Sequence, residues 1–144
     1  MSQDIESIPA LLNECRTIAV VGLSANADRP SNEVAAYMQA HGYRIIPVNP
    51  TYAGANILNE HCYATLKQAA ETLSENGVTI QMVDCFRKSE HMMGIVDEAI
   101  AIGARCVWMQ LGVVNEAAAE KARQAGLAVV MNKCVKIEHS RYTM

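Results

Sequence analysis

Five basic side chains stand in segments that follow predicted strands, where they could bind an anionic ligand. They are Arg29, Arg87, Lys88, Lys133 and Lys136. The carboxyl ends of parallel strands meet at one edge of a sheet, and ligands of such sheets bind beyond that edge. The whole chain has a formal net charge of −3, so a basic edge would be a local feature that attracts an anion. The alternative is that charged residues simply occupy loops, as they do in many proteins.

The segment from residue 17 to residue 31 has the composition of a phosphate-binding turn. Residues 18–21 form an apolar run typical of a strand buried on both faces. Gly22 permits a sharp turn and a close approach of the backbone to a ligand. Pro30 and Ser31 are residue types that begin helices, and the N-terminus of a helix favours phosphate. The alternative is an ordinary strand-to-helix turn that binds nothing.

The motifs of the commonest nucleotide sites are missing. A dinucleotide site needs three glycines in the first turn and an acidic residue at the end of the second strand. Here that turn holds only Gly22, and the second strand is followed by Asn49 and Pro50. The Gly-Lys-Ser/Thr sequence of a P-loop does not occur. The sequence therefore favours a phosphate-bearing ligand other than NAD or ATP.

Strand-like and helix-like apolar patterns alternate along the chain. The predicted strands cover residues 18–21, 43–48, 78–83, 106–109 and 127–131. The predicted helices cover residues 5–13, 32–40, 66–73 and 90–102, and a further one follows Asn115; residues 51–63 form a long loop. Strands that alternate with helices build a parallel sheet. We predict a single α/β domain over residues 1–144, a three-layer Rossmann-like domain with a five-stranded, mainly parallel sheet.

Composition narrows the class of partner. Of the 144 residues 51% are hydrophobic and 19% charged, which is ordinary for a soluble domain. Only 5% are aromatic, which argues against base-stacking platforms, and the negative charge gives no general attraction to nucleic acid or anionic lipid. No apolar run reaches the length of a membrane span, and the first residues do not resemble a secretory leader. We therefore expect a cytoplasmic protein with a small-molecule ligand, and the sequence names no protein partner.

The cysteines and histidines form no recognisable metal site. The five cysteines are odd in number and widely spaced, and no CxxC pair occurs, so neither zinc nor a disulfide framework is predicted. The four histidines are also dispersed. Cys85 and Cys134 lie at predicted strand ends, where a thiol could meet a ligand. Burial as a free thiol is the commoner explanation of such cysteines.

Six ordered motifs span nearly the whole chain. They are Ile18-Ala-Val-Val-Gly-Leu-Ser24, Arg29-Pro-Ser31, Ile46-Pro-Val-Asn-Pro50, Asp84-Cys-Phe-Arg87, Val107-Trp-Met-Gln-Leu-Gly112 and Val130-Met-Asn-Lys-Cys134. Together they resemble the small, stand-alone family of coenzyme A (CoA)-binding proteins. That family is similar to the N-terminal CoA-binding domain of the succinyl-CoA synthetase α subunit.

The resemblance implies four groups of ligand-binding residues. It assigns the CoA phosphates to Gly22, Leu23, Ser24, Asn26, Arg29, Pro30 and Ser31. It assigns the adenosine end to Asn49, Pro50 and Thr51, the bound chain to Phe86 and Arg87, and the pantetheine to Gln110, Leu111 and Gly112. Relatives often carry a basic residue at the position of Thr51, so this chain departs from the family at the expected contact with the 3′-phosphate.

The resemblance implies a protein that binds CoA or an acyl-CoA without evident catalysis of its own. The synthetase's phosphohistidine domain and nucleotide-grasping partner have no counterpart here, and no catalytic or metal-binding residue is identified. One alternative is a small enzyme, either a nucleotide-dependent reductase or an acyl-CoA-handling enzyme with Cys85 as nucleophile. That nucleophile would need a base that the sequence does not identify. A second alternative is a scaffold whose phosphate site is vestigial.

Overall fold

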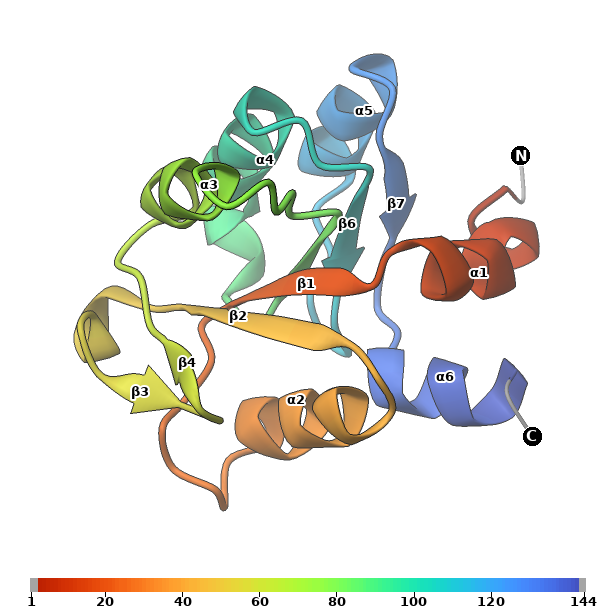
Figure 1. Ribbon diagram of the computed structural model, residues 1–144. Helices are drawn as coiled ribbons and strands as arrows, with labels where there is room; N and C mark the ends of the chain where they lie inside the picture. Colours follow the sequence, from red (N-terminus) through yellow and green to blue (C-terminus); the bar gives the residue numbers. More distant parts are fainter. Residues whose placement is uncertain (1–2, 143–144) are drawn as a thin grey trace.

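The computed structural model, which describes residues 3–142, is built around a five-stranded sheet (Figure 1). Its strands are β1 (Thr17–Val21), β2 (Arg44–Val48), β5 (Met82–Cys85), β6 (Cys106–Met109) and β7 (Ala128–Val130). They pair in the order β2-β1-β5-β6-β7, and every pair is parallel. These strands are short and rich in β-branched and other apolar residues, as buried parallel strands are. The predicted Rossmann-like fold is confirmed, and this sheet is parallel throughout.

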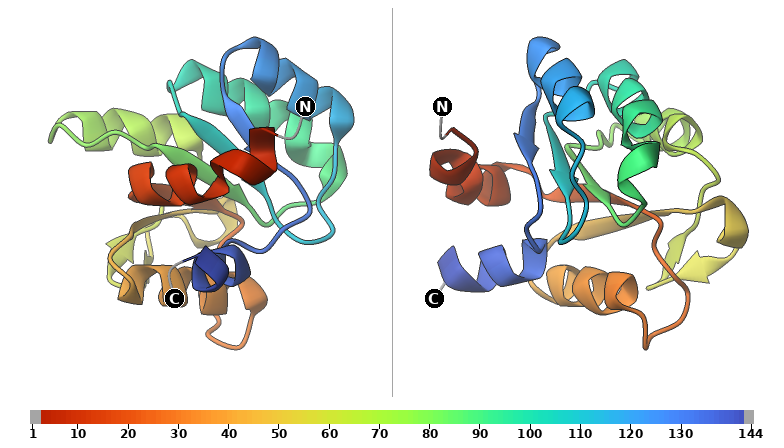
Figure 2. Two further views of the ribbon diagram at one scale, coloured as in Figure 1. Left: turned by 90° about the vertical axis from the view of Figure 1, so that its right-hand side faces the viewer. Right: turned by 180° about the vertical axis from the view of Figure 1, so that it is seen from behind.

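Helices cover both faces of the sheet, which gives three layers (Figures 1 and 2). One face is covered by α1 (Gln3–Glu14), α2 (Pro30–Ala40) and α6 (Val135–Tyr142). The other is covered by α3 (Leu66–Ser74), α4 (Met92–Ala101) and α5 (Glu116–Gln124). Successive strand residues point to opposite faces, so Val20 and Trp108 pack with α2 and α6 while Ala19 and Val107 pack with α3–α5. Two apolar cores result, one on each side of the sheet.

The strand order reverses direction between β1 and β5. From β1 the chain passes through α2 to β2 on one side, whereas β5, β6 and β7 follow one another on the other side. The segments that leave the carboxyl ends of β1 and β5 therefore diverge to opposite faces, and a crevice opens between them. This is the edge at which the sequence predicts a ligand.

The predicted long loop contains structure of its own. A 3₁₀ turn at Pro50–Tyr52 leads into a hairpin of β3 (Asn56–Ile57) and β4 (Glu60–His61). Its two turn residues, Leu58 and Asn59, have φ of 53° and 65°, as a type I′ hairpin turn requires. The buried side chain of Ile57 anchors the hairpin to the core beside α2.

Most predicted elements are shifted by a residue or two at their ends, and four departures from the prediction have a clear physical reason. The third strand is β5 rather than residues 78–83, because residues 78–81 lead from α3 into the sheet. Of these, Gln81 bonds to the neighbouring strands: its N–H donates to the carbonyl oxygen of Thr17, and its carbonyl oxygen accepts from the N–H groups of Arg105 and Cys106. Helix α1 begins at Gln3 despite Pro9, whose ring is exposed. The helix predicted from residue 90 begins as a 3₁₀ turn at Ser89–His91 before α4. Helix α6 was not predicted, because its eight residues carry little apolar periodicity.

Neither a membrane-spanning helix nor a metal site is found among residues 3–142. No helix in this part of the chain is long and apolar enough to cross a membrane. Nor do three or more of its His, Cys, Asp and Glu side chains gather where they could hold a metal ion. All five cysteines are buried, and none is joined in a disulfide within this part of the chain.

Candidate functional site

Two adjoining hollows lie at the carboxyl edge of the sheet. The larger, here called the main cleft, has a volume of about 720 Å³ and is lined by Pro30, Val34, Phe86, Arg87, Lys88, His91, Gln110, Leu111, Val113 and Cys134. The smaller, called the side hollow, has a volume of about 370 Å³ and is lined by Gly22, Ser24, Arg29, Pro30, Ser31, Asn49, Thr51, Tyr52 and Phe86. Pro30 and Phe86 line both, so one ligand can occupy the two together.

Gly22 lets the segments after β1 and β5 approach each other. Its φ is +90°, a conformation that side-chain-bearing residues rarely adopt. Its backbone N–H donates to the carbonyl oxygen of Val48 (2.8 Å). A Cβ at this position would overlap the carbonyl oxygen of Phe86 and lie 3.0 Å from Arg87 Cδ. The bare backbone of Gly22 therefore brings Phe86 to the border between the hollows.

Side-chain hydrogen bonds fix the loop between Gly22 and α2. The N–H of Ser24 donates to Ser31 Oγ (3.0 Å), and the N–H of Asn26 donates to Ser24 Oγ (3.0 Å). Asn32 Nδ2 donates to the carbonyl oxygen of Ser24 (2.9 Å). The loop thus uses these groups to hold its own shape, which places Ser24 and Ser31 on the wall of the side hollow. Asn26 is exposed and lines neither hollow.

Arg29 is the cation of the side hollow. Within residues 3–142 its guanidinium forms neither a hydrogen bond nor an ion pair, and the residue is exposed. Arg29 is also the N-cap of α2, and its side chain does not cap the helix. The first turn of α2 therefore presents backbone N–H groups beside a free positive charge, an arrangement that suits a phosphate.

Asn49 builds the opposite wall rather than offering free groups. Its Nδ2 donates to the carbonyl oxygen of Leu23 (3.0 Å), and its Oδ1 accepts from the N–H of Thr51 (3.0 Å). Leu23 is fully buried and lines neither hollow. Pro50 is exposed and also lies outside both. Through its hydrogen bonds with the N–H groups of Thr51 and Tyr52, Asn49 holds these two residues at the rim of the side hollow.

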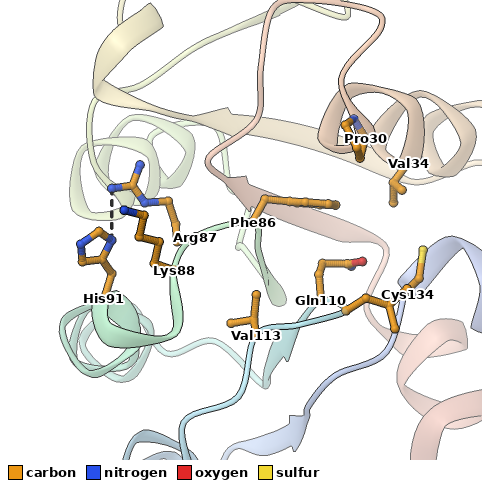
Figure 3. Close-up of a pocket in the computed structure, with 10 residues that line it drawn as sticks. Pro30, Val34, Phe86, Arg87, Lys88, His91, Gln110, Val113 and Cys134 are labelled. Atoms are coloured by element: carbon orange, nitrogen blue, oxygen red, sulfur yellow. Dashed lines mark hydrogen bonds between the residues drawn. The ribbon is translucent and has the colours of Figure 1, made fainter.

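The main cleft is apolar along its walls and basic at one end. Arg87, Lys88 and His91 gather at that end, with Arg87 Nη2 and His91 Nδ1 3.5 Å apart (Figure 3). Val34 and Cys134 lie at the opposite end (Figure 3). Ser89 fixes the walls, because the N–H of Val114 donates to its Oγ (2.9 Å). A ligand in the main cleft would therefore contact mostly uncharged side chains, with the basic side chains of Arg87 and Lys88 at one end.

A buried carboxyl group lies beneath the floor of the main cleft. Gln110 Nε2 donates to Asp84 Oδ1 (2.5 Å), and both residues are almost inaccessible to solvent. Burial raises the pKa of Asp84 to about 7, although its hydrogen bonds with Gln110 and the backbone of Cys85 act in the opposite direction. The hydrogen bond to Asp84 thus fixes the side-chain amide of Gln110 at the floor of the main cleft.

Cys85 is not placed to act on a ligand. It lies in the core on the α3–α5 side of the sheet and lines neither hollow. Its Sγ donates to the carbonyl oxygen of Val83 (3.7 Å). Burial, followed by the charge of Asp84, raises the pKa of this thiol well above its usual value, so it lacks the thiolate character of a nucleophile.

Comparison with known families decides the class of protein. Residues 16–140 match the family model of a CoA-binding domain. This chain belongs to that family. The chain is 38% identical over 133 residues to the uncharacterized protein YneT of Bacillus subtilis (strain 168), with 92% of each chain covered.

Solved structures of similar sequences share its fold. A hypothetical protein from Pyrococcus horikoshii OT3 is 36% identical, with a TM-score of 0.84 over 96% of this chain and 92% of that chain. The protein ID.343 from Thermus thermophilus is 30% identical, with a TM-score of 0.82 over 96% of this chain and 98% of that chain.

The structure brings together most, but not all, of the residues that the sequence singles out. Besides Leu23, Asn26 and Pro50, Gly112 lies outside both hollows, and its N–H donates to Asn132 Oδ1 (2.8 Å). Lining residues that the family resemblance does not assign are Val34, Tyr52, Lys88, His91, Val113 and Cys134. Val34 could have been found, because it stands one helical turn after Pro30. Lys88 and Cys134 carry a weaker signal, their place after predicted strands.

Proposed function

We propose that this protein binds coenzyme A or an acyl-CoA across the two hollows. The observation that carries the proposal is their junction at Pro30 and Phe86, which joins a polar, cationic hollow to a long apolar cleft. CoA has the matching chemistry, since its phosphates are anionic and its pantetheine arm is long and uncharged. Membership of the CoA-binding domain family supports the same ligand.

In this arrangement Arg29 and the N-terminus of α2 bind the phosphates. The adenosine lies at the rim formed by Asn49, Thr51 and Tyr52. The pantetheine arm passes Phe86 and enters the main cleft above Gln110. Among the described residues neither hollow is lined by a carboxylate, so no fixed negative charge opposes an anionic ligand.

An acyl-transfer enzyme is the less favoured alternative. Such an enzyme needs a nucleophile within hydrogen-bond reach of a base. The main cleft contains one thiol and one imidazole, but Cys134 and His91 lie at its opposite ends (Figure 3). The site therefore suits binding rather than thioester cleavage.

We expect CoA to raise the melting temperature far more than NAD or NADP at the same concentration. A ligand present at 100 times its Kd stabilises the folded protein by about 2.7 kcal/mol, and the first turn lacks the glycines and the acidic partner of a dinucleotide site. Thermal denaturation and titration calorimetry with the three ligands measure the difference. Pantetheine and 3′,5′-ADP probe the two hollows separately. Tighter binding of NAD than of CoA would refute the proposal.

We expect Arg29→Ala to weaken CoA binding by about 1.5–3 kcal/mol, the scale of a charge-assisted hydrogen bond. The melting temperature of the unliganded protein should hardly change, because the described residues offer this guanidinium no partner. Lys67→Ala is the matched control, since it removes the same charge from α3, away from both hollows. Calorimetry that finds the same CoA affinity in Arg29→Ala and wild type would remove Arg29 from the site.

A further inference from the structure

One cysteine differs from the other four in its access to the proposed site. Cys15, Cys62, Cys85 and Cys106 are each 0% exposed, whereas Cys134 is 9% exposed and lines the main cleft. Figure 3 shows its Sγ at the end of the cleft beside Val34.

The backbone around Cys134 is fixed on both sides. Its carbonyl oxygen accepts from the N–H of Glu138 (3.0 Å), so it is tied to the first turn of α6. The residue before it, Lys133, accepts a hydrogen bond from Trp108 Nε1 (2.8 Å) through its carbonyl oxygen. The thiol is therefore held in place at the cleft wall rather than carried on a free loop.

The side chain of Gln110 is a second feature that indicates a ligand at this end of the main cleft. Gln110 is only 3% exposed, and its Nε2 is engaged by Asp84. Its Oε1 has no hydrogen-bond partner among residues 3–142 and points toward the end of the cleft where Val34 and Cys134 lie (Figure 3). No fully buried side-chain oxygen or nitrogen among the described residues lacks a partner, so Gln110 Oε1 is open to the cleft, where it can accept from a donor on a bound ligand. The amide N–H groups of a pantetheine arm are such donors.

We propose that Cys134 forms a mixed disulfide with the thiol of CoA bound in the main cleft. The inference rests on the proposed function, because only a ligand that carries its thiol into the cleft can react there. The oxidant is the disulfide form of the ligand, CoA disulfide.

The exchange is balanced in atoms and electrons. Cys134 gives up its proton to solvent, and its sulfur attacks one sulfur of CoA disulfide. The bond between the two CoA sulfurs breaks as the bond between Cys134 Sγ and CoA forms. The second CoA leaves as a thiolate that takes up a proton. The Cys134 sulfur is thereby oxidised and the leaving sulfur reduced, and a dithiol reverses the reaction.

The test compares two disulfides on reduced wild-type protein. CoA disulfide and oxidised glutathione are added separately, and intact-mass and peptide-mass spectrometry follow the adduct. We expect one CoA on Cys134, formed at least about tenfold faster than the glutathione adduct, because binding in the cleft orients the reacting sulfurs. A CoA analogue that lacks the thiol should slow the reaction by competition, and dithiothreitol should release the CoA. Cys134→Ser should form no adduct, whereas Cys15→Ser should form it as the wild type does.

Calorimetry of reduced wild type with CoA separates the two proposals. If CoA binds but the adduct is absent, lies on another cysteine, or forms no faster than with glutathione, the inference is wrong and the proposed function stands. If neither CoA nor its thiol-free analogue binds, both are wrong. Because peptide mapping is done on wild-type protein, the result does not depend on the folding of a variant.

Discussion

Replacing Gly22 with alanine is expected to lower the free energy of unfolding by about 2–5 kcal/mol. The left-handed backbone at φ +90° costs a side-chain-bearing residue about 1–2 kcal/mol. The new methyl group would also overlap the carbonyl oxygen of Phe86, and overpacking against atoms that cannot yield costs about 1–3 kcal/mol. Since the displaced atoms belong to the border of both hollows, CoA affinity should fall together with stability. Urea unfolding and calorimetry measure the two effects.

Gly77→Ala is the matched control for this substitution. Gly77 also has a positive φ, +73°, but a Cβ there would meet nothing within 4 Å. The free energy of unfolding of Gly77→Ala should therefore fall only by the cost of the left-handed backbone, about 1–2 kcal/mol. This variant should bind CoA as the wild type does. Equal losses in the two variants would show that the close approach of the β1 and β5 segments is not what requires glycine at position 22.

The stability of the wild type is expected to fall as the pH rises toward 7, through the titration of Asp84. Burial raises the pKa of this carboxyl from 3.8 to about 7 in the folded protein. Between these values the unfolded chain has lost the proton and the folded protein has kept it. The stabilising contribution is thus complete below the unfolded pKa and disappears as the pH rises through the folded pKa, an effect on the order of 4 kcal/mol for a fully buried group.

Asp84→Asn should remove this pH dependence. Asparagine keeps an oxygen that can accept from Gln110 Nε2, but it does not titrate. The difference in unfolding free energy between variant and wild type, measured in urea at pH 5 and pH 8, should therefore shift in favour of the variant at the higher pH. Asp97→Asn serves as control, because Asp97 is an exposed partner of Lys121. Parallel stability curves for wild type and Asp84→Asn would contradict the assignment.

The predictable part of the fold is the part governed by local pattern. Strand β6 occupies the predicted residues 106–109, and Asn115 caps α5 by accepting from the N–H of Ala118 (3.0 Å). The sequence places β5 too early because its apolar residues begin at Val78, and apolar residues alone do not reveal where pairing with β1 begins. That boundary depends on the register Ile18↔Met82, which joins residues far apart in the sequence.

The candidate site also has a part that local sequence predicts and a part that it does not. Gly22, Arg29 and Ser31 belong to one turn, so their grouping at one hollow follows from local sequence. The main cleft is assembled from α2, the segments after β5 and β6, and the start of α6. No spacing in the sequence links Val34 to Cys134, and α6 itself was not predicted. Residues that meet only through the packing of several elements carry no local signal.

The shared lining of the hollows by Pro30 and Phe86 has a kinetic consequence. Pro30 belongs to the β1–α2–β2 half of the sheet and Phe86 to the β5–β6–β7 half. A molecule that fills both hollows therefore ties the two halves together like a removable cross-link. If the halves separate only when the hollows are empty, unfolding proceeds from the ligand-free fraction of the protein, and free ligand slows it by the factor 1 + [L]/Kd.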